Sequence, residues 1–452
     1  MSHRIVSGGR GHTIALPHMG RHAAGQAAPE NRAARGEAAE ARGVRAHHLP
    51  VLILAASCFV SGLNVNVLSP LIPRIGQTFG VSDAAVGQLA TLHAAIAGLL
   101  AVAIAPVIDR YPRRAVLRVE LAILLLAIGL SALAPSFGWL FAGQALAGLG
   151  GAIIGGICLA ATGDLFVDER QRNRAIGTVS AAFSIATIAG LPLITEVSNV
   201  VGWRWAIAVL LAPTALVTLG TSWLPTVVAR APTAAADHHR YREALENWQV
   251  NWLLAGVIVV CLVMAGWQVY FGAYTTAVFA ISANALSLLF LAAGVGQLLA
   301  AETLALLVRL GSARTVFVLV ALVESLAFLS MSLVGGAWWQ LLPFVVLLSA
   351  GMTTLYLSTT VLLLDSQPAA RGAVMALQTG CFEFGWALGT AVTGGALVLL
   401  GSYPAVYATL GLILPLSLLF LAISRGVARR PGPSDGRASP SLAPSGSGPG
   451  AG

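Results

Sequence analysis

The sequence predicts an all-α integral membrane protein with twelve transmembrane helices in two six-helix pseudo-symmetric halves. Two compositional observations predict the membrane class. Hydrophobic residues make up 57% of the 452 residues and charged residues only 10%, against roughly 25% charged residues in soluble proteins. The mean hydropathy is +0.82. Too few charged groups remain to cover a water-facing surface of this size, so lipid is the expected solvent.

Twelve apolar runs are each long enough to cross the hydrocarbon core of a bilayer, which takes about 20 helical residues. In lipid every backbone polar group must find its hydrogen-bond partner within the protein, so these runs are expected to be helices. The predicted spans are 50–72, 84–106, 115–134, 138–162, 174–197, 203–224, 250–275, 282–308, 315–334, 338–363, 372–400 and 403–424.

The arginines predict the orientation of these spans. All 26 basic residues are arginine, and an inside N-terminus places every one of them on the inner side except Arg74 and Arg204. This distribution follows the positive-inside rule. We therefore expect both termini to be cytoplasmic and the protein to lie in the inner (cytoplasmic) membrane. The positive charge sits in tails and loops rather than on one face, so we expect no nucleic-acid partner.

Composition divides the chain into five segments. An Arg/His-rich cytoplasmic tail, 1–48, lacks a long apolar run and is expected to be disordered. Two six-helix bundles, 49–224 and 250–424, flank a polar cytoplasmic loop, 225–249. A Pro/Gly/Ser-rich cytoplasmic tail, 425–452, is also expected to be disordered. The division into six and six spans predicts an internal repeat, which the charged loops after spans two and eight support.

Several stretches resemble the major facilitator superfamily, and within it the twelve-span bacterial drug and metabolite efflux group. The most specific is APVIDRYPRR after span two, where Ala105 and Pro112 replace glycines that the family usually has. GLPL followed by GWRWAI resembles the fifth span and its loop, and RLGSAR resembles a degenerate second copy of the first loop. The resemblance covers roughly 50–424 and implies the major facilitator fold. The stretches are 105–114, 190–193, 202–207 and 309–314.

The resemblance implies a latch at the inner ends of the spans. Asp109 is expected at the positive N-terminal end of span eleven. Arg113 or Arg114 is expected to pair with Asp164, and these contacts would hold the two halves together while the site faces outward. The alternative is that the charges are solvated loop residues that fix topology. The predicted inner-gate residues are Asp109, Arg110, Arg113, Arg114, Asp164, Arg309 and Arg314.

One position departs from the efflux group. In LFAGQALAGLGGA, residues 140–152, Gln144 stands where proton-driven exporters have a buried arginine. A neutral amide cannot influence a nearby acid by charge. Asn64 and Asn66 likewise stand where related exporters often have an aspartate in span one. The resemblance to exporters therefore does not establish proton coupling for this chain.

Glu383 is the preferred candidate for a protonatable or substrate-contacting group. It lies about twelve residues into span eleven, with Trp386 nearly one turn further. An acid at this depth is costly and points to a function. The alternative is a permanently protonated, hydrogen-bonded structural residue. His93 lies within span two and can titrate near neutral pH, although a neutral packed imidazole is the alternative.

Uncharged polar and aromatic side chains complete the candidate site at helical spacing. Alternatively, the Ser and Thr side chains only join neighbouring helices, and the aromatic side chains only form a belt at the membrane interface. Span seven also has an aromatic stripe of Trp267, Phe271 and Tyr274. The substrate or proton site candidates are Glu383, Asn64, Ser61, Gln144, Gln268, Tyr270, Tyr356, Thr353, Trp386 and His93.

The expected function is secondary active transport of a small amphipathic solute by alternating access, in the direction of export, by a monomer with protons as the candidate coupling ion. We expect no cofactor, no metal and no enzymatic activity, since the motifs of P-loop and metallopeptidase enzymes are missing. One alternative is a facilitator or symporter without proton antiport. Others are a non-transporting sensor or assembly factor, and an intramembrane enzyme, which would need Glu383 and His93 in one pocket.

Overall fold

The twelve predicted spans are present in the computed structural model, which describes residues 29–108, 111–166, 168–225 and 241–425. Within these ranges, twelve helical segments are long and apolar enough to cross a membrane. Neither a strand nor a bridge occurs among the described residues. The chain forms two compact units, Met1–Leu49 and Pro50–Gly452, and the spans belong to the second from Pro50 onward.

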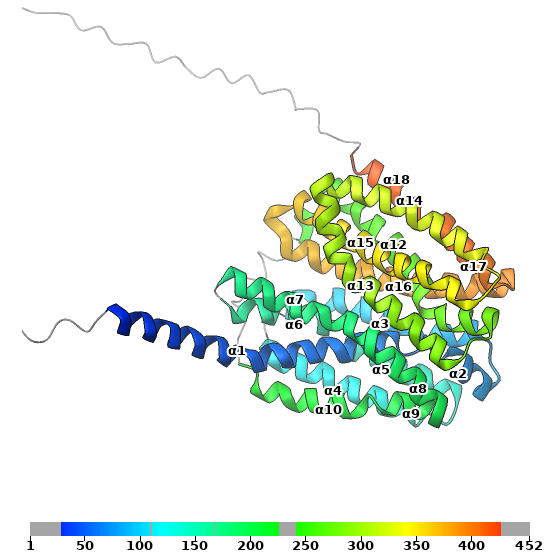
Figure 1. Cartoon of the computed structure of the whole chain (residues 1–452), viewed down its shortest axis with the longest axis horizontal. Helices are drawn as coiled ribbons and strands as arrows, with labels where there is room; N and C mark the ends of the chain where they lie inside the picture. The colour runs from blue at the N-terminus through cyan, green and yellow to red at the C-terminus, as the bar shows by residue number, and fades with distance from the viewer. Residues whose placement is uncertain (1–28, 109–110, 167, 226–240, 426–452) are drawn as a thin grey trace, which may run out of the picture. The chain divides into compact units, whose positions relative to one another are not determined.

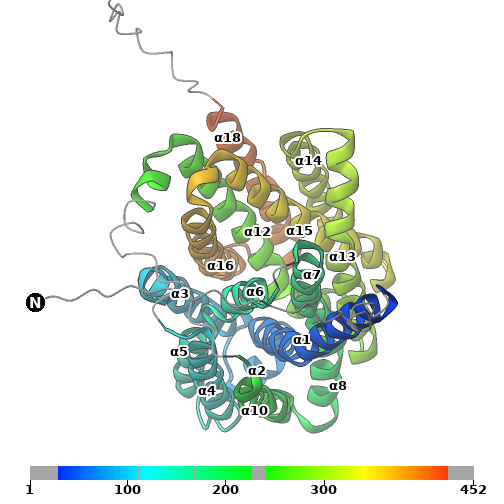
Figure 2. The same cartoon turned by 90° about the vertical axis from the view of Figure 1, so that its left-hand side faces the viewer.

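The first six spans lie on one side in Figure 2 and the last six on the other. The first six consist of α1 (Pro29–Asn66), α3 (Asp83–Ile108), α4 (Arg113–Ala132), α5 with α6 (Phe137–Gly151, Ile154–Leu165), α7 with η1 and α8 (Glu169–Ile185, Ala186–Gly190, Leu191–Val201), and α9, α10 and η2 (Trp203–Ala208, Leu211–Gly220, Thr221–Trp223). A short helix, α2 (Ile72–Phe79), precedes α3.

The last six spans are unbroken helices except for the twelfth, and Figure 1 shows them running along a common direction. They are α12 (Trp248–Phe279), α13 (Ala283–Leu310), α14 (Ala313–Ser332), α15 (Leu341–Ser366), α16 (Arg371–Leu400), and α17 with α18 (Tyr403–Ile413, Leu416–Ile423). Short 3₁₀ turns, η3 (Trp338–Gln340) and η4 (Pro368–Ala370), precede α15 and α16.

The structure corrects the predicted bounds of the first span. Helix α1 begins at Pro29, so part of the tail that we expected to be disordered is helical. This segment is rich in Ala, Arg and Glu, which favour helix. The helix ends at Asn66 rather than at residue 72. Residues 241–246 of the predicted central loop are also helical, whereas 1–28, 226–240 and 426–452 lie outside the described residues.

Polar side chains cap several helices where they leave the apolar core. Asn247, Ser282 and Ser312 accept hydrogen bonds from backbone N–H groups in the first turns of α12, α13 and α14. Such caps satisfy donors that have no partner within the helix. At the other end of α16, Gly401 has a φ of 63°, a left-handed conformation that glycine adopts without strain. The span boundaries are therefore fixed by local chemistry as well as by hydropathy.

Two of the first six spans are interrupted. Span five contains a π-turn, η1, directly before α8, where Pro192 occupies one of the first two positions. Proline has no N–H to donate and its ring crowds the preceding turn, which explains the irregular helix there. Span four breaks at Ala152 and Ile153. The buried carboxyl of Glu120 on α4 lies close to the Ile153 backbone at this break.

Two seams join the first six spans to the last six. We call the contact of α3 with α16 the first seam, and the contact of α13 with α7, η1 and α8 the second seam; both are extensive. In the first seam, the hydroxyl oxygens of Thr91 and Thr390 are 2.8 Å apart. In the second seam, the Ser287 hydroxyl donates to the Glu196 carboxylate at 3.0 Å. Any ligand path between the halves must lie between these seams.

Candidate functional site

A pocket lies beside the second seam, between spans one, five, seven and eight. The space within it is about 290 Å³, including the part that is open to the surroundings. Its lining residues are Asn66, Thr187, Leu191, Trp267, Gln268, Phe271, Phe290, Ala293 and Gln297. No charged side chain occurs among these lining residues. Because they come from α1, η1, α8, α12 and α13, the pocket has walls from both groups of six spans.

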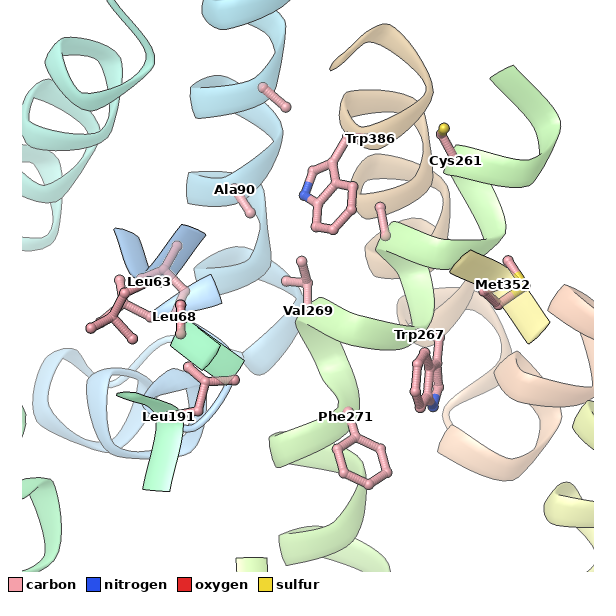
Figure 3. Packing of buried hydrophobic residues seen from close by; sticks show 14 of the residues in the cluster. Leu63, Leu68, Ala90, Leu191, Cys261, Trp267, Val269, Phe271, Met352 and Trp386 are labelled. Carbon is pink, nitrogen blue, oxygen red and sulfur yellow. The ribbon is translucent and has the colours of Figure 1, made fainter. Parts of the chain in front are cut away.

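Three aromatic rings form the wall on the side of the last six spans. The ring centroids of Trp267 and Phe271 are 5.7 Å apart, and those of Phe271 and Phe290 are 5.9 Å apart in an edge-to-face arrangement. Figure 3 shows Trp267 and Phe271 extending from α12, and Leu191 of α8, which belongs to the same cluster of buried residues. Edge-to-face pairs hold each ring in a defined orientation. A flat apolar group can therefore stack against this wall.

Uncharged polar groups face the same cavity. The Thr187 hydroxyl donates to the Gln297 amide oxygen at 3.2 Å, which joins η1 to α13. The Asn66 amide donates to the Gly62 carbonyl at 3.0 Å, and this leaves its own amide oxygen available. The Gln268 side chain is half-buried and forms no hydrogen bond with the described residues. The pocket thus offers amide donors and acceptors beside an aromatic wall.

Gly294 explains how α13 comes close to the π-turn. A Cβ at this position would lie 2.7 Å from the Ile188 backbone nitrogen, closer than side-chain atoms approach a backbone. The close approach places Gln297, nearly one turn further along α13, opposite Thr187. The pocket geometry therefore depends on a glycine and a π-turn that face each other across the second seam.

The structure places only part of the predicted site at this pocket. Gln268 lines it, as do Trp267 and Phe271 of the predicted stripe. In span one the lining amide is Asn66 rather than Asn64. Asn64 and Ser61 are buried in α1 and do not line the pocket.

Tyr356, Trp386 and Glu383 form a different group, between α15 and α16. The rings of Tyr356 and Phe382 are 5.4 Å apart, and those of Phe382 and Trp386 are 5.3 Å apart. The Glu383 carboxyl lies within electrostatic reach of the Tyr356 hydroxyl. No hydrogen bond from a described residue to this carboxyl is present. Thr353, one turn before Tyr356 along α15, donates to its own helix at Ser349.

Glu383 lies directly on the first seam. A Cβ at Gly98 of α3 would approach the Glu383 Cβ to 3.0 Å and its backbone carbonyl carbon to 3.6 Å. The side chain is only partly exposed. A carboxyl at this position changes its surroundings whenever α3 and α16 move relative to each other.

His93 and Gln144, predicted separately, come together. The buried His93 imidazole on α3 interacts with the buried Gln144 side chain on α5. His93 faces α5, whereas Glu383 contacts α3 at Gly98, and neither residue lines the pocket beside the second seam.

Tyr270 closes the space between the halves rather than lining the pocket. Its hydroxyl donates to the Thr390 carbonyl at 3.2 Å. Its ring and hydroxyl occupy the space over Gly87 of α3, and its hydroxyl lies 2.6 Å from where a Cβ of Gly394 would be. Only glycine at both positions leaves room for the tyrosine. Tyr270 thus links α12 to both helices of the first seam.

Further contacts link the halves at the end of the bundle where α3 begins, which we call the Asp83 end. The Tyr403 hydroxyl donates to the Asp83 carboxylate at 2.6 Å. The Ser69 hydroxyl donates to the Gln268 carbonyl at 2.6 Å. Gly272 of α12 packs against the backbone of Ser69 and Pro70. In this structure the halves are therefore joined at the Asp83 end.

The predicted inner-gate latch is formed in part, but not between the halves. Arg113 Nε donates to Asp164 at 2.7 Å. This pair joins α4 to α6, both among the first six spans, so it does not hold the two halves together as we expected. Arg309 is exposed and Arg314 is half-buried, and neither pairs with an acidic residue among the described residues. Asp109 and Arg110 lie outside the described residues.

Sequence reasoning missed three residues that the structure singles out. Thr187 and Gln297 line the pocket, and Glu120 is a buried acid in span three whose Oε2 has no partner among the described residues. The signal for Gln297 was available, since an amide in the middle of an apolar span needs a partner. Thr187 had no comparable signal, because threonine is common in helices that pack in membranes.

Comparison with known proteins agrees with this architecture. Residues 54–301, more than half of the chain, match the family model of the Major Facilitator Superfamily. An uncharacterized MFS-type transporter of Bacillus subtilis, YwfA, is 28% identical over 162 residues, which are 35% of this chain and 39% of that protein. The chloramphenicol efflux pump Rv0191 of Mycobacterium tuberculosis is 31% identical over 203 residues, 43% of this chain and 48% of the pump.

The matched stretches thus span less than half the length of these curated relatives. The crystal structure of the human organic anion transporter MFSD10 superposes with a TM-score of 0.63 at 16% identity, and the match covers 83% of this chain and 99% of that one. At this level of sequence identity the similarity shows only that the two proteins share a fold. The twelve apolar helices, the fold and the family match lead to one conclusion: the chain is a multi-pass membrane protein that belongs to the major facilitator superfamily.

Proposed function

We propose that this protein is a secondary transporter that exports a small, uncharged, amphipathic solute by alternating access. The observation that supports it most directly is the pocket beside the second seam, which has walls from both groups of six spans and no charged lining residue. The direction of export is supported by the similarity to a chloramphenicol efflux pump. The solute itself is not identified by that similarity.

The lining of the pocket supports the chemical class of the solute. Trp267, Phe271 and Phe290 offer apolar faces for a ring or a compact apolar body. The amides of Asn66, Gln268 and Gln297 offer both donors and acceptors. A solute with a net charge would leave that charge without an opposite partner in a poorly solvated pocket, which is costly. The pocket therefore favours neutral molecules with one aromatic or apolar end and one hydrogen-bonding end.

Alternating access requires the contacts at the Asp83 end to break and reform. The Tyr403 to Asp83 hydrogen bond and the placement of Tyr270 over Gly87 both cross between the halves. With the orientation that the arginines predict, the Asp83 end faces outward. The structure then corresponds to a state closed to the outside, and release of an exported solute follows the opening of these contacts.

We assign proton coupling to Glu383. Its carboxyl lies on the first seam against Gly98 and has no hydrogen-bond partner among the described residues, so its environment depends on how the halves are arranged. A group whose surroundings differ between two states binds a proton with different affinity in each state. Gln144 lies beside His93 where α5 packs against α3. The same proposal places the protein as a monomer in the inner membrane, with both termini in the cytoplasm.

The solute pocket is tested with Gln297→Leu in a bacterial host that lacks its main efflux pumps. Against a panel of neutral, cationic and anionic toxic compounds, we expect the parent protein to raise resistance to neutral amphipathic members. Gln297→Leu leaves the Thr187 hydroxyl without its partner, and we expect the gain in resistance to fall about tenfold. Thr303→Val on the same helix serves as the control, because Thr303 bonds only to its own helix. Equal resistance with all three proteins would argue against this pocket as the solute-binding site.

Proton coupling is tested by transport into inside-out vesicles. In the parent protein, we expect accumulation of the solute to require a pH gradient. Glu383→Gln should abolish accumulation while downhill solute movement persists, because the variant cannot release a proton. Glu302→Gln, at an exposed acid on α13, is the matched control. If transport by the parent protein does not depend on the pH gradient, the protein is a facilitator. If Glu383→Gln still accumulates the solute, the proposal that Glu383 couples transport to protons is wrong.

A further inference from the structure

Arg314 stands at the start of α14, and its guanidinium group has no partner in the described part of the chain. The side chain is half-buried, and its buried Nη1 atom has no hydrogen-bond acceptor there. A charged N–H group that has lost its water and gained no acceptor is costly. The Arg314 guanidinium group is therefore suited to an anionic ligand.

A second arginine lies close to Arg314. Arg425 follows the end of α18, is exposed, and lies within electrostatic reach of Arg314. Residues 303–323 and 384–425 contain no aspartate or glutamate. Among the described residues, neither arginine forms an ion pair, either with Asp365 at the end of α15 or with another acid. Because the two like charges repel each other at short range, an anion between them is favourable.

Aromatic side chains mark the depth of these arginines in the membrane. The ring centroids of Trp248 and Trp252 at the start of α12 are 5.2 Å apart, and those of Trp252 and Phe420 on α18 are 5.5 Å apart. The Trp248 indole N–H donates to the Ile423 carbonyl at 3.4 Å. Tryptophan and arginine at the end of a span are typical of the level of the lipid headgroups. Arg425, which follows Ile423 by two residues, therefore lies at the level of the lipid phosphates.

The surface next to these arginines faces lipid. Helices α14 and α18 contact each other, and both lie at the edge of the last six spans in Figure 2. Large apolar side chains are exposed on both helices, namely Leu319 and Leu322 on α14, and Leu416 and Leu419 on α18. Leu319 and Leu419 lie between one and two helical turns deeper in the membrane than the arginines. The arginines at the headgroup level are thus continuous with a surface that contacts acyl chains.

We propose that Arg314 and Arg425 bind the headgroup phosphate of an anionic phospholipid, whose acyl chains lie along Leu319 and Leu419. A phosphate accepts bidentate hydrogen bonds from planar guanidinium groups, so one phosphate supplies both arginines with an acceptor and reduces their repulsion. The bound lipid ties the start of α14 to the end of α18. Inorganic phosphate offers the same polar chemistry, but only a lipid also covers the apolar surface. The inference is independent of the transported solute, because neither arginine lines the solute pocket.

The test uses the full chain purified in detergent, with phosphatidylglycerol and phosphatidylcholine of identical acyl chains as probes. Native mass spectrometry counts the bound lipids, and the unfolding temperature is measured with each lipid. We expect phosphatidylglycerol to bind and stabilise the parent protein more than phosphatidylcholine does. In Arg314→Gln/Arg425→Gln, the apparent affinity for phosphatidylglycerol should fall about tenfold, so that the difference between the two lipids disappears.

Variants of matched charge separate this site from a general attraction between a basic protein and anionic lipid. Arg172→Gln/Arg242→Gln removes two arginines that each pair with a glutamate in the same helix, and it should keep the preference for phosphatidylglycerol. Arg425→Gln alone changes an exposed side chain, so its expected loss of affinity, about threefold, does not depend on a folding defect. Arg314→Lys/Arg425→Lys keeps the charge and should retain most of the binding.

Four results would overturn the proposal. The first is equal binding of both lipids by the parent protein, and the second is unchanged binding of phosphatidylglycerol by Arg314→Gln/Arg425→Gln. The third is an equal loss of affinity in Arg172→Gln/Arg242→Gln, which would show that only the net charge matters. The fourth is protection by inorganic phosphate as large as that by phosphatidylglycerol, which would show that the apolar surface takes no part in binding.

Discussion

The two seams between the first six and the last six spans differ in how their helices meet. The first seam consists of two uninterrupted helices, α3 and α16, with glycines at positions 98, 380 and 394 where the other side approaches. The second seam sets an uninterrupted helix, α13, against a span that contains a π-turn. The pocket that we propose for the solute lies beside the second seam.

This difference agrees with our proposal that the two seams have different functions. Continuous helices that pack through small residues can change their contact as whole units, which suits the roles that we propose for Glu383 in coupling and for Tyr270 in gating. An irregular turn frees side chains such as Thr187 from regular helix packing, which suits ligand binding. In our proposal, binding belongs to the second seam and coupling to the first, so substitutions in the two seams should have different consequences.

The largest expected effect is that of Gly294→Ala in the second seam. The added methyl would lie 2.7 Å from the Ile188 backbone nitrogen, so α13 must move away from η1 and the pocket must change shape. Overpacking of this kind costs about 1–3 kcal/mol, and we expect solute transport in vesicles to fall about tenfold or more. Gly395→Ala, where a methyl meets nothing within 4 Å, is the control. Equal transport by both variants would contradict the proposal that close packing in the second seam shapes the solute pocket.

A smaller effect is expected from Gly394→Ala in the first seam. Its methyl would lie 2.6 Å from the Tyr270 hydroxyl oxygen, the end of a side chain rather than a backbone. We expect a loss of transport of about threefold to tenfold from an overpacking cost near 1 kcal/mol. The Gln88 amide nitrogen, also a side-chain end, would lie equally close at 2.6 Å. Because Tyr270→Phe removes one of the two clashing atoms, the double variant should recover part of the activity. Purely additive losses would show that the two residues do not interact.

The smallest effect is expected from Tyr403→Phe at the Asp83 end. The substitution removes the 2.6 Å hydrogen bond to Asp83, whose net contribution is about 0.5–1.5 kcal/mol or somewhat more for a charged acceptor. We expect the open state at this end to gain population about twofold to tenfold. The measurement is the labelling rate of a cysteine placed at Ser69, compared with and without Tyr403→Phe. An unchanged rate would mean that this bond does not control the opening.

Hydropathy predicted the twelve spans, and the structure confirms them. The prediction succeeds because lipid is the solvent of each helix, independently of the other helices. Two details of the helices were not predicted. Helix α1 extends back to Pro29 because its composition favours helix, although the segment is polar. Span five has a π-turn that the GLPL stretch alone did not predict, since proline can also end or kink a helix.

The candidate site could be predicted only in part. The aromatic stripe of α12 and Gln268 were identified because aromatic and amide side chains stand out in an apolar run. Thr187 and Gln297 are 110 residues apart and meet only across the second seam. The resemblance predicted the Arg113 and Asp164 pair, but the chain order alone did not show that both belong to the same side of the molecule.

By itself, the sequence determined that this chain belongs in a membrane, how many times it crosses, and which polar residues lie within the spans. These properties follow from the transfer of each segment into lipid, which depends on local composition. Only the tertiary structure decided which of those residues face a cavity, because a pocket arises where two helices fail to pack fully. The close approach of Gly294 to a π-turn, and the separation of Glu383 from Gln268, are consequences of helix packing that no single segment encodes.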